Sequence, residues 1–171
     1  NIKYPLQASV IGAALLFSSA VVQAEGAAGL HFGSDAVGGT LIRGADAGEV
    51  DTALVWNDKD KSGFISMTYL NQKQNLKTGA ERVAIGAKIY VVNNSDSDFT
   101  GGGVAIGGGV GHLIEGDIPI ALSASIYYSP DLISFGDSTG LIEYSVRAAA
   151  ELATNSSVYV GVNSINIDSD G

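Results

Sequence analysis

Hydrophobic and polar residues alternate along three long stretches of the chain, 82–92, 118–128 and 142–152. In each stretch, one set of alternate positions is largely Val, Ile, Leu, Ala and Tyr, and the other mixes charged residues with Gly, Ala and Ser. Alternation over ten or more residues is typical of a strand with two different faces. It is also longer than the usual globular strand of about five or six residues. We therefore predict long strands.

Six further stretches alternate less regularly and bring the predicted strands to nine. They are 26–33, 38–44, 50–57, 63–71, 102–114 and 157–167. Short connections rich in Gly, Asn, Asp and Ser separate the nine, and no amphipathic helix is expected between them. This order predicts an antiparallel meander, hence an up-and-down barrel or a sandwich. In the last stretch the apolar positions change parity near Asn163, which we interpret as a β-bulge.

The composition of the two faces favours a transmembrane barrel. In an outer-membrane barrel the apolar face meets lipid, while small or charged residues share the lumen. Trp56, Tyr69, Tyr128 and Tyr144 fall near strand ends on the apolar faces, as an interfacial aromatic girdle would. Soluble sandwiches also alternate. A soluble periplasmic sandwich or lipid-binding barrel is therefore an alternative.

Charged residues on the polar faces form a predicted lumen-facing set. Its members are Arg82, Lys88, Glu143, Arg147 and Glu151. We expect them to form ion pairs inside a filled barrel. The alternative is that they line a narrow, porin-like conduit and set its selectivity. The interior of a barrel of about eight to ten strands is mostly filled by side chains, so any pore would be small.

The first 24 residues are expected to be a signal peptide that directs export through the inner membrane. A short basic start precedes the apolar run "ASVIGAALLFSSAVV", and small residues lead up to a predicted cleavage site after Ala24. A buried N-terminal helix is the alternative. The remainder, 25–171, is expected to form one barrel domain. It contains no apolar run near the roughly 20 residues of a membrane helix.

Charge and composition exclude several functions. The 171 residues carry a net charge of −9, whereas nucleic-acid binding needs a Lys/Arg patch for the phosphates. Cysteine is absent, which excludes disulfides, thiolate metal sites and Cys nucleophiles. We therefore expect no nucleic-acid partner and no cofactor.

The stretch "WNDKDKSGFISM" (56–67) has the spacing of an EF-hand loop at Asp58, Asp60 and Gly63. Its flanks alternate as strands, however, and Tyr69 stands where the motif needs a bidentate Glu. We interpret it as a hairpin turn.

The glycine-rich stretch 101–112 lacks the Lys-Ser/Thr of a P-loop and a following helix. Lumen packing or a kink is therefore favoured over a nucleotide site. His31 and His112 have no second His or Cys at ligand spacing and no nucleophile on the same strand face. We place His112 at an interface and expect neither a metal site nor enzymatic activity.

Several segments together resemble the YfaZ family of Gram-negative outer-membrane proteins over most of 25–168. They include "VAIGAKIYVVN", "GGGVAIGGGVG" and "IEYSVRAAAEL". The most specific is Tyr127-Tyr128-Ser129-Pro130-Asp131, which is similar to the family's Tyr-Tyr-Ala-Pro-Glu/Asp segment. The resemblance implies a small β-barrel in the outer membrane and supplies no catalytic residues.

Barrels of this kind usually end on a strand with a terminal aromatic residue, whereas this chain stops at "DSDG". Bacterial barrels also favour even strand numbers. We therefore expect that the C-terminal strand is missing here and that the full protein has ten strands. Eight is the alternative, if the two short N-terminal stretches do not span the membrane.

If the chain starts in the periplasm, the predicted extracellular connections are 34–37, 57–63, 93–100, 129–139 and 168 onward. Aspartates gather in these loops, at Asp58, Asp60, Asp96, Asp98, Asp131 and Asp137. A solvated loop surface is the simplest interpretation. The alternative is weak divalent-cation bridging to lipopolysaccharide phosphates.

Taken as a whole, the sequence predicts a small outer-membrane β-barrel with a structural or surface role in the cell envelope and no enzymatic activity. The expected partners are outer-membrane lipid, lipopolysaccharide and, during insertion, the barrel assembly machinery. We expect a monomer. A narrow channel for small solutes or ions is the first alternative function, and a soluble lipid-binding protein is the second.

Overall fold

The computed structural model of the chain describes residues 2–6, 26–33, 35–45, 48–74, 81–153 and 156–169. Nine long strands follow one another in this part of the chain, and each overlaps one of the nine predicted stretches. They are β2 (Gly26–Phe32), β3 (Ala36–Ala45), β4 (Gly48–Asn57), β5 (Ser62–Gln74), β6 (Glu81–Asn94), β7 (Phe99–Ile114), β8 (Ile120–Ser129), β10 (Ser138–Ala153) and β11 (Ser156–Ser169). Three short elements complete the described part: β1 (Ile2–Leu6), the 3-10 helix η1 (Asp131–Ile133) and β9 (Ser134–Gly136).

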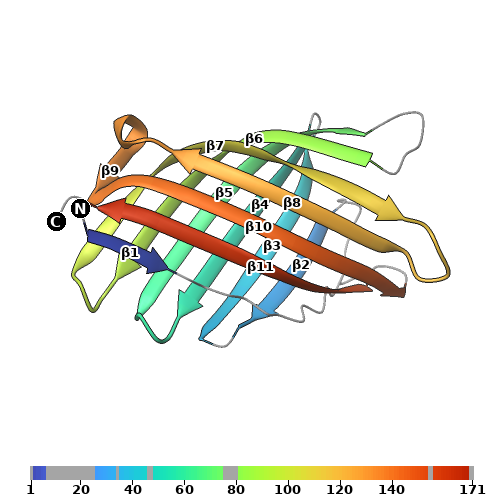
Figure 1. The fold of residues 1–171 in the computed structure, drawn as a ribbon, viewed down its shortest axis with the longest axis horizontal. Coiled ribbons are helices and arrows are strands. Elements are labelled where there is room, and N and C mark those ends of the chain that lie inside the picture. Colours follow the sequence, from blue (N-terminus) through green and yellow to red (C-terminus); the bar gives the residue numbers. More distant parts are fainter. Residues whose placement is uncertain are drawn as a thin grey trace.

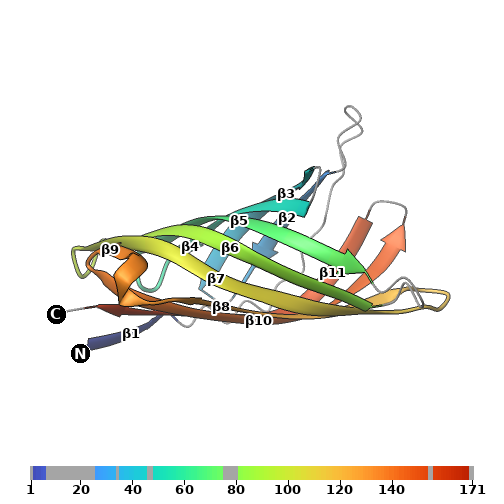
Figure 2. The same ribbon diagram turned by 90° about the horizontal axis from the view of Figure 1, so that it is seen from above.

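The strands form one antiparallel sheet in which long strands that follow one another in sequence are also neighbours in space. The order is β1-β11-β10-β8-β7-β6-β5-β4-β3-β2, and β9 pairs with β7 beside this path. Figure 1 shows β8, β10 and β11 in front, slanting in one direction, and β2 to β5 behind them, slanting in the other. Figure 2 shows the sheet curling around an interior. The predicted all-β, antiparallel up-and-down fold is confirmed, and the curl is that of a barrel.

The long strands at the two ends of the sheet, β2 and β11, meet through side chains. The hydroxyl of Tyr159 on β11 lies 2.9 Å from Nδ1 of His31 on β2. In an antiparallel meander of nine long strands the first and last run in the same direction. In the described ranges no backbone ladder joins them. We call this junction the seam.

A short strand lies on the outer edge of β11. β1 pairs antiparallel with it, from Ile2 opposite Ser169 to Leu6 opposite Ile165. β1 belongs to the segment that the sequence predicts to be a signal peptide. Residues 7–24 of that segment, with the predicted cleavage site, lie outside the described residues.

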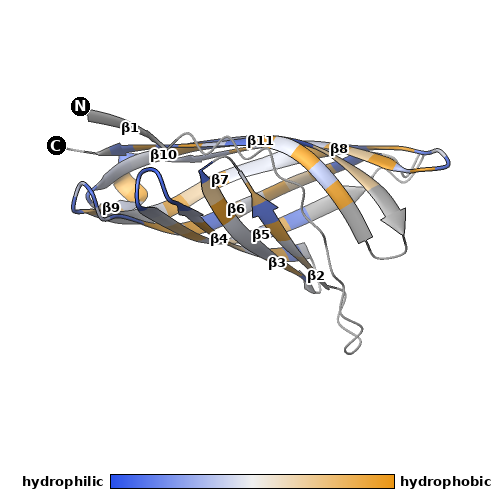
Figure 3. Ribbon diagram, turned by 90° about the horizontal axis from the view of Figure 1, so that it is seen from below, coloured by the Kyte–Doolittle hydropathy of each residue, from blue (hydrophilic) through white to orange (hydrophobic). Residues whose placement is uncertain are grey.

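The side chains separate into an apolar outer face and a mostly polar inner face, as the alternation predicts. On β6, Ile85 is 68% exposed and Ile89 is 56% exposed. Lys88, which lies between them, and Tyr90, which follows Ile89, are buried. The same holds on four other strands, with Leu54 and Trp56 on β4, Ile65, Met67 and Tyr69 on β5, Ile126 and Tyr128 on β8, and Tyr144 and Val146 on β10 outside. Figure 3 shows hydrophobic residues recurring along the strands and hydrophilic ones in the turns.

The parity change in β11 is not a bulge, so that interpretation was wrong. Asn163 pairs with Ser145 and Ile165 with Glu143 in an unbroken register, and the irregularities of the β10–β11 pair lie near its ends. Ile165 therefore faces the interior, where only 2% of it is exposed. An apolar residue on the lumen side moves the hydrophobic positions to the other parity without any change in the backbone.

One end of the lumen is filled by apolar side chains, which the predicted small or charged lining did not include. The cluster contains Val55, Phe64, Tyr90, Val92, Phe99, Leu141, Ile165 and Ile167. The rings of Phe64 and Tyr90 stack with their centroids 6.2 Å apart. The Tyr90 hydroxyl lies 3.2 Å from the Ser138 hydroxyl. Aromatic burial of this kind contributes strongly to packing, so this end of the lumen is closed.

The connections alternate between the two ends of the sheet. Those at 58–61, 95–98 and 130–137 share the end with the apolar cluster, as do Gly33 and Asp35, and 115–119 lies at the other. The connections at 46–47, 75–80 and 154–155 lie outside the described residues. Which end faces outward stays a prediction. Within the described ranges, no helix is long and apolar enough to cross a membrane.

Candidate functional site

A buried ion pair crosses the lumen between β6 and β10. Lys88 Nζ lies 2.6 Å from Glu143 Oε2, and only 8% and 10% of the two side chains are exposed. Their strands are not neighbours, because β7 and β8 lie between them. The Lys88 ammonium also lies 4.5 Å from the centroid of the Tyr127 ring, and Tyr127 pairs with Glu143 across β8 and β10. The three residues together fill the centre of the lumen.

Small residues on β7 make room for these side chains. Ala105 pairs with Lys88 and is completely buried. Gly107 pairs with Tyr127, and a Cβ at Gly107 would lie 2.6 Å from Tyr127 Cδ1. A larger side chain at either position would occupy the space that the lysine and the ring now use. The glycine-rich stretch therefore serves lumen packing, the interpretation that the sequence favoured over a nucleotide site.

A second polar group lies at the seam. The Arg147 guanidinium carbon is 5.4 Å from the centroid of the Tyr159 ring, a cation–π distance. Tyr159 in turn shares its hydrogen bond with His31, and the histidine tautomer decides which of the two donates. Glycines leave room for both side chains. A Cβ at Gly161 would lie 2.8 Å from Arg147 Cγ, and a Cβ at Gly38 would lie 2.5 Å from His31 Cδ2.

Asp51 on β4 faces both polar groups. The charges that act on its carboxylate are those of Lys88 and Arg147, followed by Glu49 and Glu143. Its Oδ1 atom is buried and has no hydrogen-bond partner among the described residues. Carboxylates from two strands thus share the lumen with two cations. Oppositely charged groups attract one another strongly in a low dielectric.

The structure brings some members of the predicted lumen set together and leaves others apart. Lys88 and Glu143 form the ion pair, and Arg147 joins the lumen through Tyr159. Arg82 lies near the start of β6 and is exposed. Glu151 pairs with Ser157 in the β10–β11 ladder, and its side chain lies outside the described part.

Little space remains between the side chains at the seam. A cavity of about 30 Å³ lies among His31, Arg147, Tyr159 and Asn163. That volume is about the share of one water molecule in the liquid. The Oδ1 atom of Asn163 is buried without a protein hydrogen-bond partner in the described ranges, so a single water would satisfy it. The lumen at this level is packed.

The EF-hand-like stretch is a hairpin turn between β4 and β5, as predicted. Asn57 Oδ1 accepts hydrogen bonds from the backbone N–H groups of Lys59 and Asp60, at 3.0 and 3.3 Å. Lys61 takes a positive φ of 47°, which closes the turn. An Asx-type cap followed by a left-handed residue is turn chemistry and supplies no helix for an EF-hand.

Three of the loop aspartates have side-chain partners within the protein. Asp60 Oδ2 accepts a 3.3 Å hydrogen bond from the side-chain amide of Asn57. Asp58 Oδ1 lies 2.5 Å from Lys61 Nζ, and Asp137 Oδ2 accepts a 2.9 Å hydrogen bond from the backbone N–H of Thr100. Asp96, Asp98 and Asp131 are exposed, and Asp60 is half-buried. In the described part of the chain, no three His, Asp or Glu converge on a metal position. Cation or lipopolysaccharide contact by these acids stays a prediction.

Apolar exterior, filled polar interior and a single curled antiparallel sheet define a small protein of the β-barrel class. The family model described as "YfaZ precursor" matches residues 6–171. The chain belongs to the YfaZ family, as the sequence resemblance implied, and the description as a precursor agrees with the expected signal peptide. No curated protein and no solved structure matches the chain.

Proposed function

We propose that the protein is a small outer-membrane β-barrel with a filled lumen, which serves the cell envelope as a structural or surface component. The observation that carries this proposal is the inverted distribution of side chains. Charged residues such as Lys88 and Glu143 are buried, while large apolar residues are exposed. A chain surrounded by lipid requires this arrangement.

The exposed apolar surface is continuous across neighbouring strands. Ile85 on β6, Ile106 on β7 and Ile126 on β8 are 68%, 63% and 60% exposed. Soluble monomers rarely expose contiguous apolar patches of more than a few hundred Å², whereas a bilayer covers such a surface at no cost. This face supports lipid as the principal partner. Trp56, Tyr69, Tyr128 and Tyr144 lie on it with 41–54% exposure, where they suit an interfacial girdle.

The filled lumen supports a structural role over a conduit. The Lys88–Glu143 pair and Tyr127 occupy its centre, and the apolar cluster closes one end. Barrels of about eight to ten strands have interiors that side chains fill. Conduction would require these groups to move. We include no catalytic step, since hydrolysis would need a nucleophile beside a histidine and the partner of His31 is Tyr159.

An outer-membrane location also bears on the partners and the assembly state of the protein. Lipopolysaccharide and the barrel assembly machinery are the partners that an outer-membrane location implies, and the protein acts as a monomer. A net charge of −9 gives it no affinity for nucleic acid.

Two measurements on the full chain test the proposal. We expect the protein to fractionate with outer membranes and to migrate faster on gels before heating than after. In planar bilayers we expect no conductance steps. Conductance steps whose ion selectivity changes in Glu143→Gln would replace this proposal with the narrow channel. Recovery in the soluble fraction, without heat-modifiable migration, would replace it with a soluble periplasmic lipid-binding protein.

A further inference from the structure

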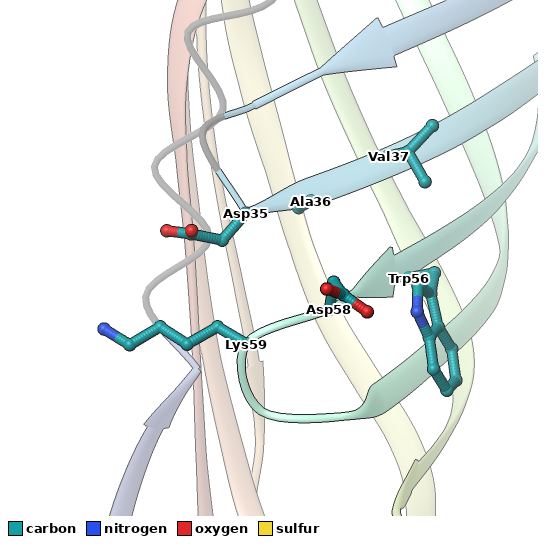
Figure 4. Close-up of a pocket in the computed structure, with 6 residues that line it drawn as sticks. All are labelled: Asp35, Ala36, Val37, Trp56, Asp58 and Lys59. Carbon is teal, nitrogen blue, oxygen red and sulfur yellow. The ribbon is translucent and has the colours of Figure 1, made fainter.

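A hollow of about 440 Å³ opens where the apolar outer face meets the turns. It is lined by Asp35, Ala36, Val37, Trp56, Asp58 and Lys59. Figure 4 shows Asp35 and Lys59 on its turn side, with Val37 and Trp56 projecting from the strands on the other. Its size is that of a small-molecule site. One wall is charged and the other apolar, so the hollow fits an amphiphile.

The two turns that form the charged wall are tied together. The backbone N–H of Asp58 donates a 2.8 Å hydrogen bond to the Asp35 carbonyl, and the N–H of Gly33 donates a 2.6 Å bond to the Ala36 carbonyl. Asn57 fixes the second turn through its bonds to Lys59 and Asp60. The base of the hollow is therefore preorganised, which lowers the entropic cost of binding.

Lys59 supplies the positive charge of the hollow. The Asp58 carboxylate is held by Lys61 at 2.5 Å, whereas Lys59 has no ion pair with any described residue. The ammonium of Lys59 is therefore the group that is free to bind an anion. Trp56 adds an indole N–H, which is a donor. The Asp35 carboxylate on the same side opposes an anion and limits its affinity.

Directly below the hollow, the outer face has a notch. Val37 pairs with Trp56 at the edge of the hollow. Two residues further along β3, on the same face, Gly39 lies between its ladder partners Leu30 and Leu54. A Cβ built at Gly39 meets its nearest neighbours only at 3.7 and 3.8 Å. The notch is thus walled by two exposed leucines and floored by a glycine, a shape that suits an acyl chain.

We propose that the hollow and notch together bind one acylated, phosphate-bearing lipid of the outer leaflet. Lys59 donates a charge-assisted hydrogen bond to the phosphate, Trp56 lies at the boundary between headgroup and chain, and an acyl chain follows the notch over Gly39. This inference rests on the proposed function and on the predicted orientation of the chain, in which these turns face outward. It replaces cation bridging by Asp58 with direct binding by a lysine.

Trp56 is the only tryptophan of the chain, so its fluorescence reports on this site alone. The full chain, refolded in dodecyl maltoside micelles, is titrated with lipid A, with a diacylglycerol and with inorganic phosphate. We expect a saturable change with lipid A only. Lys59→Ala should raise the Kd about tenfold, the value of a modest charge-assisted hydrogen bond. Gly39→Leu should also weaken lipid A binding, because it fills the notch.

Two matched variants sharpen the test. Lys61→Ala changes a lysine of the same turn that does not line the hollow. We expect it to weaken binding by clearly less than Lys59→Ala does, because it acts only by releasing the exposed Asp58 carboxylate from its ion pair. Asp35→Asn should tighten binding, because it removes a like charge. Equal weakening in Lys59→Ala and Lys61→Ala would overturn the proposal, as would equal binding of the diacylglycerol. Weakening by Asp35→Asn, together with loss of binding in EDTA, would favour a bridging cation instead.

Failure of this inference is distinguishable from failure of the proposed function. In vesicles of bromine-labelled phosphatidylcholine, the membrane barrel predicts quenching of Trp56 by bulk lipid, with or without a specific site. Quenching without selectivity for lipid A would overturn only the lipid site. Absence of quenching, in protein that shows no heat-modifiable migration, would overturn both.

Discussion

The lumen and the β4–β5 turn each contain a lysine–carboxylate pair of nearly the same length, and the two differ in almost everything else. Lys88 Nζ lies 2.6 Å from Glu143, with 8% and 10% of the side chains exposed. Lys61 Nζ lies 2.5 Å from Asp58, with 47% and 79% exposed. The first pair joins strands that are not neighbours, and the second joins residues three apart in one turn.

Burial, and not distance, decides what such a pair contributes to stability. At the turn, water solvates either charge when its partner is absent, and exposed pairs contribute about 0–1 kcal/mol. In the lumen each charge has lost water and depends on the other, so removing one leaves a desolvated ion. We therefore expect the consequences of substitution to fall from the centre of the lumen, through the seam, to the turn.

Breaking the lumen pair should have the largest effect. Lys88→Met keeps the length of the side chain and leaves the Glu143 carboxylate buried without its cation. We expect the free energy of unfolding to fall by about 3–5 kcal/mol. Urea unfolding of the protein in lipid vesicles, followed by far-UV circular dichroism, measures this change.

The double variant Lys88→Met/Glu143→Leu is the control for that experiment. It removes both charges, so most of the lost stability should return, and the double variant should be more stable than Lys88→Met alone. Additive losses from the two substitutions would show that the pair is not coupled, and the comparison between lumen and turn would then fail.

Packing around the pair is tested next, at Gly107. The Cβ of Gly107→Ala would fall on the backbone carbonyl oxygen of Ile126 and lie 2.6 Å from Tyr127 Cδ1. Such overpacking costs about 1–3 kcal/mol. Gly111 on the same face of β7 provides the control, since a Cβ there meets its nearest atoms at 3.6 and 3.7 Å. Equal unfolding midpoints for the two alanine variants would show that the lumen is loosely packed.

The sequence predicted the strands and their faces because the alternation is a local signal. It placed Lys88 and Glu143 on lumen faces by parity alone, and the burial of both agrees with it. Their pairing was not predictable residue by residue, because β7 and β8 separate the two strands. Contact between strands that are not neighbours depends on how far the sheet curls, which no short pattern records.

The seam shows the same limit more sharply. His31 and Tyr159 are 128 residues apart, so no spacing within the strand of His31 indicates this partner. Parity alone indicates which of these side chains face inward. Tyr159 falls between the outward positions Val158 and Val160, and Asp51 has the opposite parity to the outward Leu54 on the same strand. The hydrophobicity of Ile165 alone would indicate the outer face, whereas one end of this lumen is apolar and contains this side chain.

At the seam, Tyr159→Phe removes the hydroxyl that meets His31 and keeps the ring beneath Arg147. We expect a loss of about 0.5–1.5 kcal/mol in the free energy of unfolding, the usual contribution of one hydrogen bond. Tyr144→Phe, on the exposed outer face, should change stability by less than about 0.5 kcal/mol. A loss in Tyr159→Phe as large as that in Lys88→Met would mean that the seam holds the sheet in its curled form.

The smallest effect is expected at the turn. Lys61→Ala removes the partner of Asp58, whose carboxylate then faces water, so the free energy of unfolding should fall by no more than about 0.5 kcal/mol at low ionic strength. At about 1 M salt the Debye length is roughly 3 Å, and the difference from the unsubstituted protein should vanish. The loss caused by Lys88→Met should persist in the same salt, because ions do not enter a filled lumen. A difference at Lys61 that survives high salt would show that the turn pair is shielded from water, and the two pairs would then differ less than their exposure indicates.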